Sequence, residues 1–152
     1  MKRTLTLAAA SVAAAITATA FAGTAHAADP NAVGSYDFNV GTLSTTWTAT
    51  PCINDDDHCI HVSAGSLNGQ APWAADAFWS VGSWILFADQ PDAITCDDGT
   101  KHPGRMSYSW DAATLKGWAS IYNNGVCGTK PYTMAAPFTL TKLGPAEMPN
   151  AA

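Results

Sequence analysis

The sequence predicts an all-β domain in which an antiparallel up-and-down meander closes into a small barrel, preceded by a signal peptide. Apolar residues alternate with smaller or polar ones in about eight short stretches, which is the period of half-buried strands. Turn residues separate these stretches, and no stretch beyond the signal peptide keeps a helical period. A two-sheet β-sandwich is the alternative, because it produces the same alternation. The barrel is favoured because the connections are local and closure leaves no exposed strand edge.

The first 27 residues have the three parts of a signal peptide. Lys2 and Arg3 provide the positive start, an alanine-rich apolar stretch covers residues 5–23, and residues 25–27 (Ala-His-Ala) form a small-x-small cleavage motif. A retained transmembrane anchor is the alternative, but the stretch is weakly hydrophobic and no charged stop-transfer cluster follows it. We therefore expect cleavage of residues 1–27, a secreted, extracellular protein, and no membrane span after cleavage.

Five strands are expected in the first half of the mature chain. Gly41 supplies the turn after the first strand, a cysteine-bounded loop precedes the third, and residues 80–83 make a hairpin connection after the fourth. By their alternating residues, these strands are 36–40, 43–49, 60–62, 75–79 and 84–88.

Turn signals also divide the second half. Residues 91–92 (Pro-Asp) are expected to interrupt the sheet, and residues 97–99 contain the Asp-Gly pair that tight turns favour. Residues 111–114 and 123–125 separate the later strands. Those strands are expected at 93–95, 106–110, 115–122 and 137–142.

The chain has four cysteines, Cys52, Cys59, Cys96 and Cys127, all beyond the signal peptide. An even number in an exported chain indicates disulfides, and four cysteines allow three connectivities. The first two flank one polar loop, whereas the last two follow neighbouring hairpins, so we expect pairs 52–59 and 96–127. No free thiol is expected, which makes a catalytic cysteine an unattractive reading.

Residues 28–143 are expected to form a single disulfide-stapled β domain, followed by a flexible C-terminal tail at residues 144–152. The mature chain has five basic and twelve acidic residues, a net charge of −7 with histidine neutral. That balance disfavours nucleic acid, because phosphate binding requires a positive patch. No cofactor motif is present, and none is expected to bind.

The run Asp55-Asp56-Asp57-His58, with His61 beyond it, is the strongest metal-site candidate. It lacks the ligand spacing, the Gly and the Glu of a calcium loop. His58 and His61 are three residues apart, so they point to opposite faces of an extended strand. A solvated turn is the preferred reading, and no metal site is expected.

Catalytic motifs are also missing from the sequence. There is no Gly-x-Ser-x-Gly elbow and no HExxH pair. His102 lies in a Gly- and Pro-containing loop that needs no catalysis to explain it. No catalytic residue is assigned, and a small secreted hydrolase would need His102 or His61 to meet a serine and an aspartate from distant positions.

Tryptophans are the better functional signal, because aromatic rings stack on sugars or line apolar cavities. Trp73 lies beside Pro72 in a loop and is expected to be the most exposed, whereas Trp79 and Trp84 flank the expected hairpin near one rim. These three are the possible ligand contacts. The competing reading is that most tryptophans fill the core of a small β domain.

Four segments carry a resemblance to a known group of proteins. They are Thr-Trp-Thr-Ala-Thr-Pro-Cys at 46–52, Pro-Asp-Ala-Ile-Thr-Cys-Asp-Asp-Gly-Thr at 91–100, Tyr-Ser-Trp-Asp-Ala-Ala-Thr-Leu at 108–115 and Ala-Pro-Phe-Thr-Leu-Thr-Lys at 136–142. The chain resembles uncharacterised small secreted proteins of mycobacteria and related actinobacteria. The resemblance implies a small extracellular β domain of bacterial origin, and it transfers no catalytic residue.

Three functions remain open at this point. The first is an exported non-catalytic binding or interaction module of the cell envelope, which an exposed Trp or Tyr patch would support. The second is a lipocalin-like carrier whose barrel holds a small apolar ligand; it requires a cavity, and a solidly packed interior would exclude it. The third is the hydrolase with a site assembled from distant residues.

Overall fold

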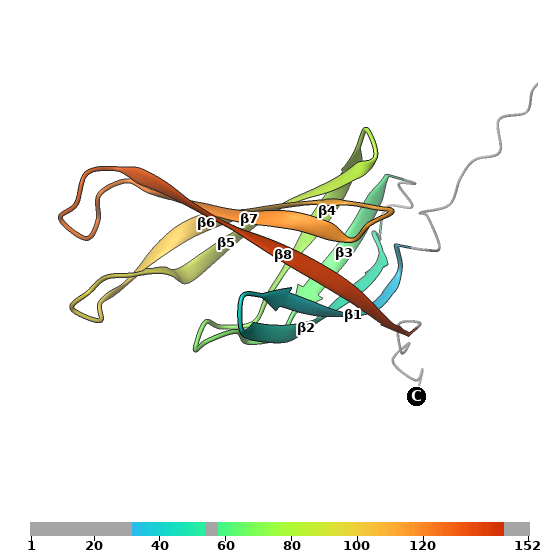
Figure 1. Cartoon of the computed structure of the whole chain (residues 1–152), viewed down its shortest axis with the longest axis horizontal. Coiled ribbons are helices and arrows are strands. Elements are labelled where there is room, and N and C mark those ends of the chain that lie inside the picture. The colour runs from blue at the N-terminus through green and yellow to red at the C-terminus, as the bar shows by residue number, and fades with distance from the viewer. Residues whose placement is uncertain (1–31, 54–57, 145–152) are drawn as a thin grey trace, which may run out of the picture.

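The computed structural model describes residues 32–53 and 58–144, and within these ranges all of the regular secondary structure is β-strand. The strands follow one another around a closed antiparallel barrel, as Figure 1 shows. The predicted all-β meander barrel is therefore confirmed over the sandwich. The strands are β1 (Gly34–Val40), β2 (Leu43–Pro51), β3 (Cys59–Ala64), β4 (Trp73–Ser80), β5 (Ser83–Thr95), β6 (Lys101–Asp111), β7 (Lys116–Asn123) and β8 (Tyr132–Gly144).

Several predictions lie outside the described residues. These are the signal peptide of residues 1–27, the acidic run Asp55-Asp56-Asp57, and residues 145–152 of the expected tail. Gly144, expected to begin the tail, is instead the last residue of β8, where it lies opposite Ser35 of β1.

The first and last strands close the barrel. Tyr36 of β1 lies opposite Trp47 of β2 on one side and Lys142 of β8 on the other. Since each strand then has two hydrogen-bonded neighbours, no long unpaired edge is left in the closed part.

The alternation seen in the sequence becomes an inner and an outer face. The inward side chains of the closed part form one aromatic-rich core: Phe38 stacks on Trp47 with ring centroids 4.5 Å apart, and Tyr108 meets Trp47 edge-on at 5.3 Å. Phe138 and Trp110 complete the cluster, each within 6.4 Å of a neighbouring ring. Most tryptophans at inward-facing strand positions therefore fill the core, as the alternative to a ligand-binding role had predicted.

Two predicted turns have the conformations that their residues favour or tolerate. Val81 and Gly82, with φ of 43° and 84°, connect β4 to β5 as a two-residue turn of the kind that suits strand twist. In the β6–β7 turn, the Asp111 carboxylate accepts hydrogen bonds from the backbone N–H groups of Ala113 and Thr114 at 3.0 and 2.7 Å. Those bonds hold the pKa of Asp111 below its ordinary value.

The prediction of a break at residues 91–92 was wrong. Pro91 and Asp92 lie inside the thirteen-residue strand β5, at a register shift between Gln90 and Ile94. A β-bulge leaves a residue without a ladder partner, so a proline without an N–H donor is tolerated there. β8 is also longer than expected and begins at Tyr132 rather than at residue 137.

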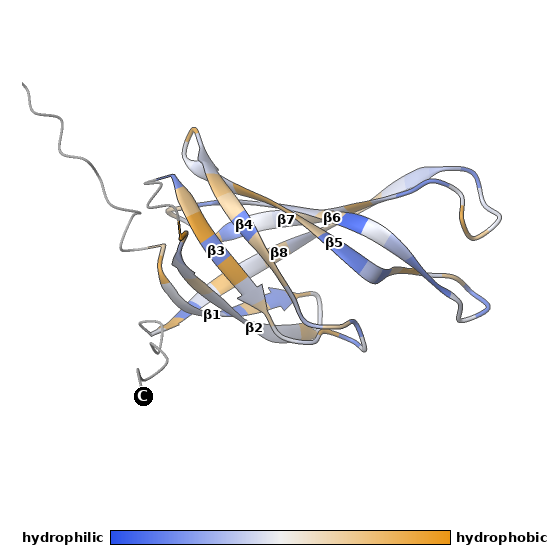
Figure 2. Cartoon of the chain, turned by 180° about the vertical axis from the view of Figure 1, so that it is seen from behind, coloured by the Kyte–Doolittle hydropathy of each residue, from blue (hydrophilic) through white to orange (hydrophobic). Residues whose placement is uncertain are grey.

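Strands β5 to β8 extend well beyond the other four at one end of the barrel (Figure 1). The β6–β7 ladder ends at Met106 opposite Ile121, and from there two hairpins continue separately. We call residues 89–105 the first arm and residues 122–133 the second arm. Figure 2 shows hydrophilic residues on β5 and β6 where the first arm leaves the barrel.

Both predicted cysteine pairs are present, at opposite ends of the molecule. Cys96–Cys127, the arm disulfide, joins the tips of the two arms. Cys52–Cys59, the loop disulfide, joins the end of β2 to the start of β3, at the barrel end that also carries the β4–β5 turn. The cysteines of the described residues are all oxidised.

Candidate ligand-binding groove

An apolar groove of about 740 Å³ opens at the barrel mouth, on the side of the arms. Its lining comes from β1, β2, the loop between β3 and β4, and strands β5 to β8. None of the residues that line it is charged. We call it the mouth groove. Its lining residues are Phe38, Val40, Leu43, Leu67, Gln70, Ala93, Met106, Tyr108, Ala119, Ser120, Ile121, Thr133, Met134, Ala135 and Ala136.

The groove exists because the strands differ in length. β1 to β4 have six to nine residues, whereas β5 and β8 have thirteen each. The inner faces of the longer strands therefore continue past the closed part with nothing opposite them. Met134 is 47% exposed there, and Leu43 at the tip of the β1–β2 hairpin is 39% exposed.

Aromatic rings form the floor of the groove. Tyr108 and Phe38 line it and lie edge to face, with ring centroids 6.1 Å apart. Beneath and beside them, Trp73 stacks on Tyr108 at 5.3 Å with an interplanar angle of 19°. The floor is thus continuous with the packed core.

Below this floor the barrel interior is filled. An interior cavity of about 20 Å³ is lined by Trp47, Trp84, Trp110 and smaller neighbours. That is about the room of one water molecule. Within the described residues, the mouth groove therefore offers a ligand much more room than this interior cavity does.

Gln90 is a buried amide at the base of the first arm. Its side chain is 2% exposed, and neither Nε2 nor Oε1 makes a hydrogen bond within the described part of the chain. Burial raises the pKa of Tyr108 to about 12, and the nearby Gln90 amide offsets part of that rise. Gln90 and Tyr108 are therefore neighbours, although no well-formed hydrogen bond joins them.

A small polar cluster fastens the β3–β4 loop to the first arm at the groove rim. Lys101 Nζ donates a hydrogen bond to the Gly69 carbonyl at 3.1 Å and lies 3.7 Å from an Asp92 carboxylate oxygen. The same oxygen accepts a bond from the Ala71 N–H at 3.3 Å. Gln70, between these contacts, is thereby held over the groove.

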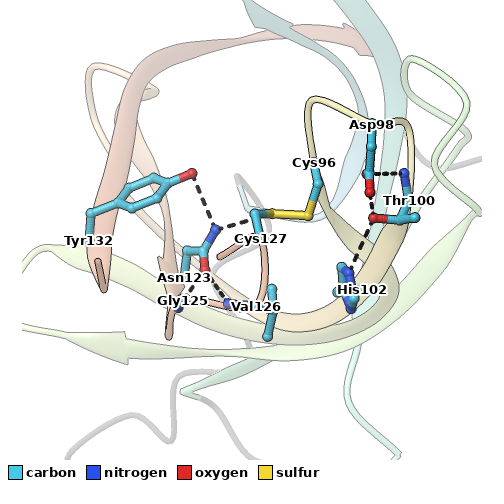
Figure 3. The surroundings of a disulfide bond; sticks show 9 residues. All are labelled: Cys96, Asp98, Thr100, His102, Asn123, Gly125, Val126, Cys127 and Tyr132. Atoms are coloured by element: carbon cyan, nitrogen blue, oxygen red, sulfur yellow. Dashed lines mark hydrogen bonds between the residues drawn. A yellow bond between two sulfur atoms is a disulfide. The ribbon is translucent and has the colours of Figure 1, made fainter. Parts of the chain in front are cut away.

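The arm tips enclose a second, more polar space of about 300 Å³ next to the arm disulfide. Asn123, fully buried, organises one side of it, as Figure 3 shows. Its Oδ1 accepts bonds from the N–H groups of Gly125 and Val126, and its Nδ2 donates to the Tyr132 hydroxyl at 3.2 Å. This amide, unlike that of Gln90, is satisfied by its own chain.

The other side of the arm tips contains His102, but not in a catalytic arrangement. The Thr100 hydroxyl donates to Asp98 Oδ1 at 2.6 Å, and its oxygen lies 3.4 Å from His102 Nε2 (Figure 3). The Thr100 hydrogen bonds hold the pKa of Asp98 below its ordinary value. A nucleophile would donate its proton to the histidine base, whereas this hydroxyl donates to the carboxylate.

His61 pairs with a carboxylate on the outer surface. Its Nδ1 lies 2.7 Å from Asp76 Oδ1, and both side chains are more than 40% exposed. Among the described residues, the potential metal-ligand group formed by Cys52, Cys59 and Asp76 has both sulfurs in the loop disulfide. It therefore offers no thiolate to an ion.

The structure does not bring the three candidate tryptophans together. Trp73 was expected to be the most exposed, but it is half-buried against Tyr108 and Trp47, close to the groove floor. Trp118 is more exposed than Trp73, because its parity on β7 places it on the outer face. Trp79 and Trp84 lie at the opposite end of β4 and β5, with ring centroids 5.3 Å apart.

Sequence reasoning missed Gln90 and the groove side chains Ile121 and Met134. Gln90 continues the two-residue period of Trp84 and Leu86, so the strand pattern contained the signal that it points inward. The assumed break at residues 91–92 concealed that signal.

None of the described residues belongs to a helix long and apolar enough to cross a membrane. Comparison of the chain with protein-family models, with curated proteins and with solved structures finds no match.

Proposed function

We propose that this chain is an exported, non-catalytic binding protein whose mouth groove holds a small, uncharged, mostly apolar molecule. The observation that carries the proposal is the groove itself, with a volume of about 740 Å³. Pockets for small molecules in proteins typically measure about 300–1,000 Å³ and are lined mainly by apolar side chains. The packed interior counts against a carrier that holds its ligand inside the barrel, so the proposal places the ligand at the mouth instead.

The lining favours an uncharged ligand. No lining residue is charged, and Lys101, which binds the loop beside Gln70, is already engaged by Gly69 and Asp92. An anion in the groove would lose hydration without gaining a counter-charge. Met106 and Met134 are unbranched and adapt to different apolar shapes, which suits a site that accepts a ligand from solvent.

The two disulfides support an extracellular place of action. Disulfides persist in oxidising compartments such as the periplasm and the cell exterior, and both predicted pairs are formed. Together with the signal-peptide pattern of residues 1–27, this leads us to assign the protein to the secreted class.

The proposal is tested with N-phenyl-1-naphthylamine, a neutral dye that fluoresces in apolar sites. The mature protein should enhance its fluorescence, and Met134→Asp should weaken that binding at least about tenfold by placing a charge in the groove. Phe87→Asp is the matched control, because Phe87 is 57% exposed on the outer face and lies outside the groove. Equal effects of the two substitutions, or no dye binding by the wild type, would refute the proposal.

A second candidate is an interaction surface on the outer face of β4 to β8. Phe78, Ile85, Ser109, Trp118 and Pro137 lie directly opposite one another across the five strands. Phe78 and Trp118 are more than half exposed, and exposed aromatic patches often mark binding surfaces.

This second candidate is tested with soluble polysaccharides. Stacking of a sugar ring on Trp118 should quench its fluorescence, and Trp118→Ser should remove the quenching. Quenching that survives this substitution would rule out the outer face.

A further inference from the structure

The dipeptide Asn-Gly occurs twice in the described part of the chain. Asn68-Gly69 lies in the loop between β3 and β4, and Asn124-Gly125 lies in the second arm. An asparagine amide that precedes glycine can be attacked by the next backbone nitrogen, because glycine has no Cβ to crowd the five-membered ring that forms. Both asparagines are exposed, so exposure does not distinguish them. The two sites differ in the hydrogen bonding of the glycine N–H.

The N–H of Gly125 is already engaged. It donates a hydrogen bond to Asn123 Oδ1 at 2.8 Å (Figure 3). Asn123 is fully buried and is itself held by Val126 and Tyr132. The nitrogen of Gly125 can therefore reach the side chain of Asn124 only after this bond is broken.

The N–H of Gly69 has no such bond. Asn68 and Gly69, with φ of 48° and 76°, are the two central residues of a turn that the Gln70 N–H closes by donating to the Leu67 carbonyl at 2.9 Å. Lys101 binds the carbonyl of Gly69 and not its nitrogen. Within the described residues, no group accepts a hydrogen bond from the Gly69 N–H. The nitrogen that would attack Asn68 is therefore available.

We propose that Asn68 is a modification site, at which the backbone nitrogen of Gly69 displaces the side-chain amide. A bond forms between that nitrogen and Asn68 Cγ, the Cγ–Nδ2 bond breaks, and ammonia leaves with the proton of the Gly69 N–H. Water then opens the resulting succinimide. Addition at Cγ gives aspartate, whereas addition at the backbone carbonyl carbon gives isoaspartate, in which the main chain runs through the side-chain carbons. The reaction needs no oxidant or reductant.

The modification would change the rim of the mouth groove. Leu67 and Gln70, which flank the Asn-Gly pair, both line the groove. Isoaspartate adds a methylene to the backbone of the turn, and the conformation of such a turn depends on its length. Both products also place a carboxylate beside a groove whose lining is uncharged. We therefore expect the modified protein to bind an apolar ligand more weakly. This consequence, unlike the reaction itself, rests on the proposed function of the groove.

The reaction is tested by ageing the mature protein, with both disulfides intact, at mildly alkaline pH. Mass spectrometry of digested samples follows the conversion of each asparagine over time. We expect Asn68 to react about tenfold faster than Asn124, because the Gly125 N–H must first lose its hydrogen bond. In guanidinium, with the disulfides reduced, the two rates should become similar.

Two results would overturn the proposal. One is an Asn68 that does not react, or reacts no faster than Asn124, in the folded protein. The other is an equal preference for Asn68 in the unfolded chain, since the fold would then not be its cause.

The effect on the groove is measured separately with N-phenyl-1-naphthylamine. Asn68→Gly is the matched control, because it removes the reactive amide and glycine suits this turn position. The affinity of the wild type for the dye should fall as the modified fraction rises, whereas aged Asn68→Gly should bind as the fresh variant does. An unchanged affinity of fully modified wild type would refute the effect on the groove. If the fresh wild type binds no dye, the proposed function fails, and the mass measurement still decides the modification.

Discussion

Two buried amides in this barrel should respond in opposite ways to apolar replacement. Gln90 has no hydrogen-bond partner within the described residues, whereas Asn123 bonds to two backbone N–H groups and to the Tyr132 hydroxyl. Gln90→Met removes an unpaired polar group at nearly constant volume. Asn123→Leu instead leaves the N–H groups of Gly125 and Val126 without their acceptor.

The magnitudes follow from the cost of unpaired groups. Leaving a buried polar group unsatisfied costs about 1–3 kcal/mol, so Gln90→Met should stabilise the fold by about 1–2 kcal/mol after allowing for its lost interaction with Tyr108. At roughly 4 °C per kcal/mol for a domain of this size, the melting temperature should rise by about 4–8 °C. Asn123→Leu should lower the free energy of unfolding by about 2–4 kcal/mol, because two backbone donors and a hydroxyl lose their partner.

Guanidinium unfolding with both disulfides intact measures these changes. The dependence of the free energy on denaturant should stay the same in all three proteins, so that midpoints can be compared directly. A loss of stability of about 1 kcal/mol or more in Gln90→Met would refute the reasoning. It would show that the amide is satisfied in solution, for example by an ordered water.

Three further predictions concern the disulfides, a turn and pH. Replacing both cysteines of the arm disulfide by serine should lower the free energy of unfolding by about 3.7 kcal/mol, and the same change in the loop disulfide by about 2.5 kcal/mol. The difference arises because the disulfides, with sequence separations of 31 and 7, restrict the unfolded chain to different degrees. Equal melting temperatures for the two variants would contradict this order. Val81→Asn should stabilise by about 1 kcal/mol, since a β-branched residue is disfavoured at a φ of 43° whereas Asn-Gly suits such turns, and a lower melting temperature would argue against that turn geometry. Burial raises the pKa of Tyr108 from about 10 to about 12, so a contribution of about 3 kcal/mol to the free energy of unfolding is complete below pH 10 and is lost as the pH rises toward 12. In Tyr108→Phe, a plot of the free energy of unfolding against pH should show a smaller alkaline loss. An unchanged slope would exclude Tyr108 as the source of that loss.

The features that were predictable from the sequence are local ones. Alternation placed Tyr36 and Phe38 on one face, the Val81-Gly82 pair marked a hairpin, and the cysteine positions relative to the strands favoured one pairing of three. Each depends on neighbouring residues or on a single turn, so no knowledge of the sheet register was required.

The groove could not be predicted in the same way, because it depends on how far some strands extend beyond others that are distant in the sequence. A proline is normally a strand terminator, yet Pro91 lies at a bulge that lets β5 continue into the first arm. Without that continuation, Gln90 reads as a loop residue and Met134 as part of a connection. Trp73 was misjudged for a related reason: it begins β4, and only closure of the barrel brings Tyr108 of the non-adjacent strand β6 against its ring.

Barrel closure through β1 and β8 constrains the order in which the molecule can fold. Tyr36 and Lys142, which lie opposite each other in that ladder, come from the two ends of the sheet's sequence. Seven of the eight strands can assemble by adding one neighbouring hairpin after another, but the final seam must wait for the last strand. A partly synthesised chain therefore exposes β1 as an open edge that can pair with other chains. Mutations that weaken β8 should therefore promote aggregation more than their effect on equilibrium stability alone would suggest.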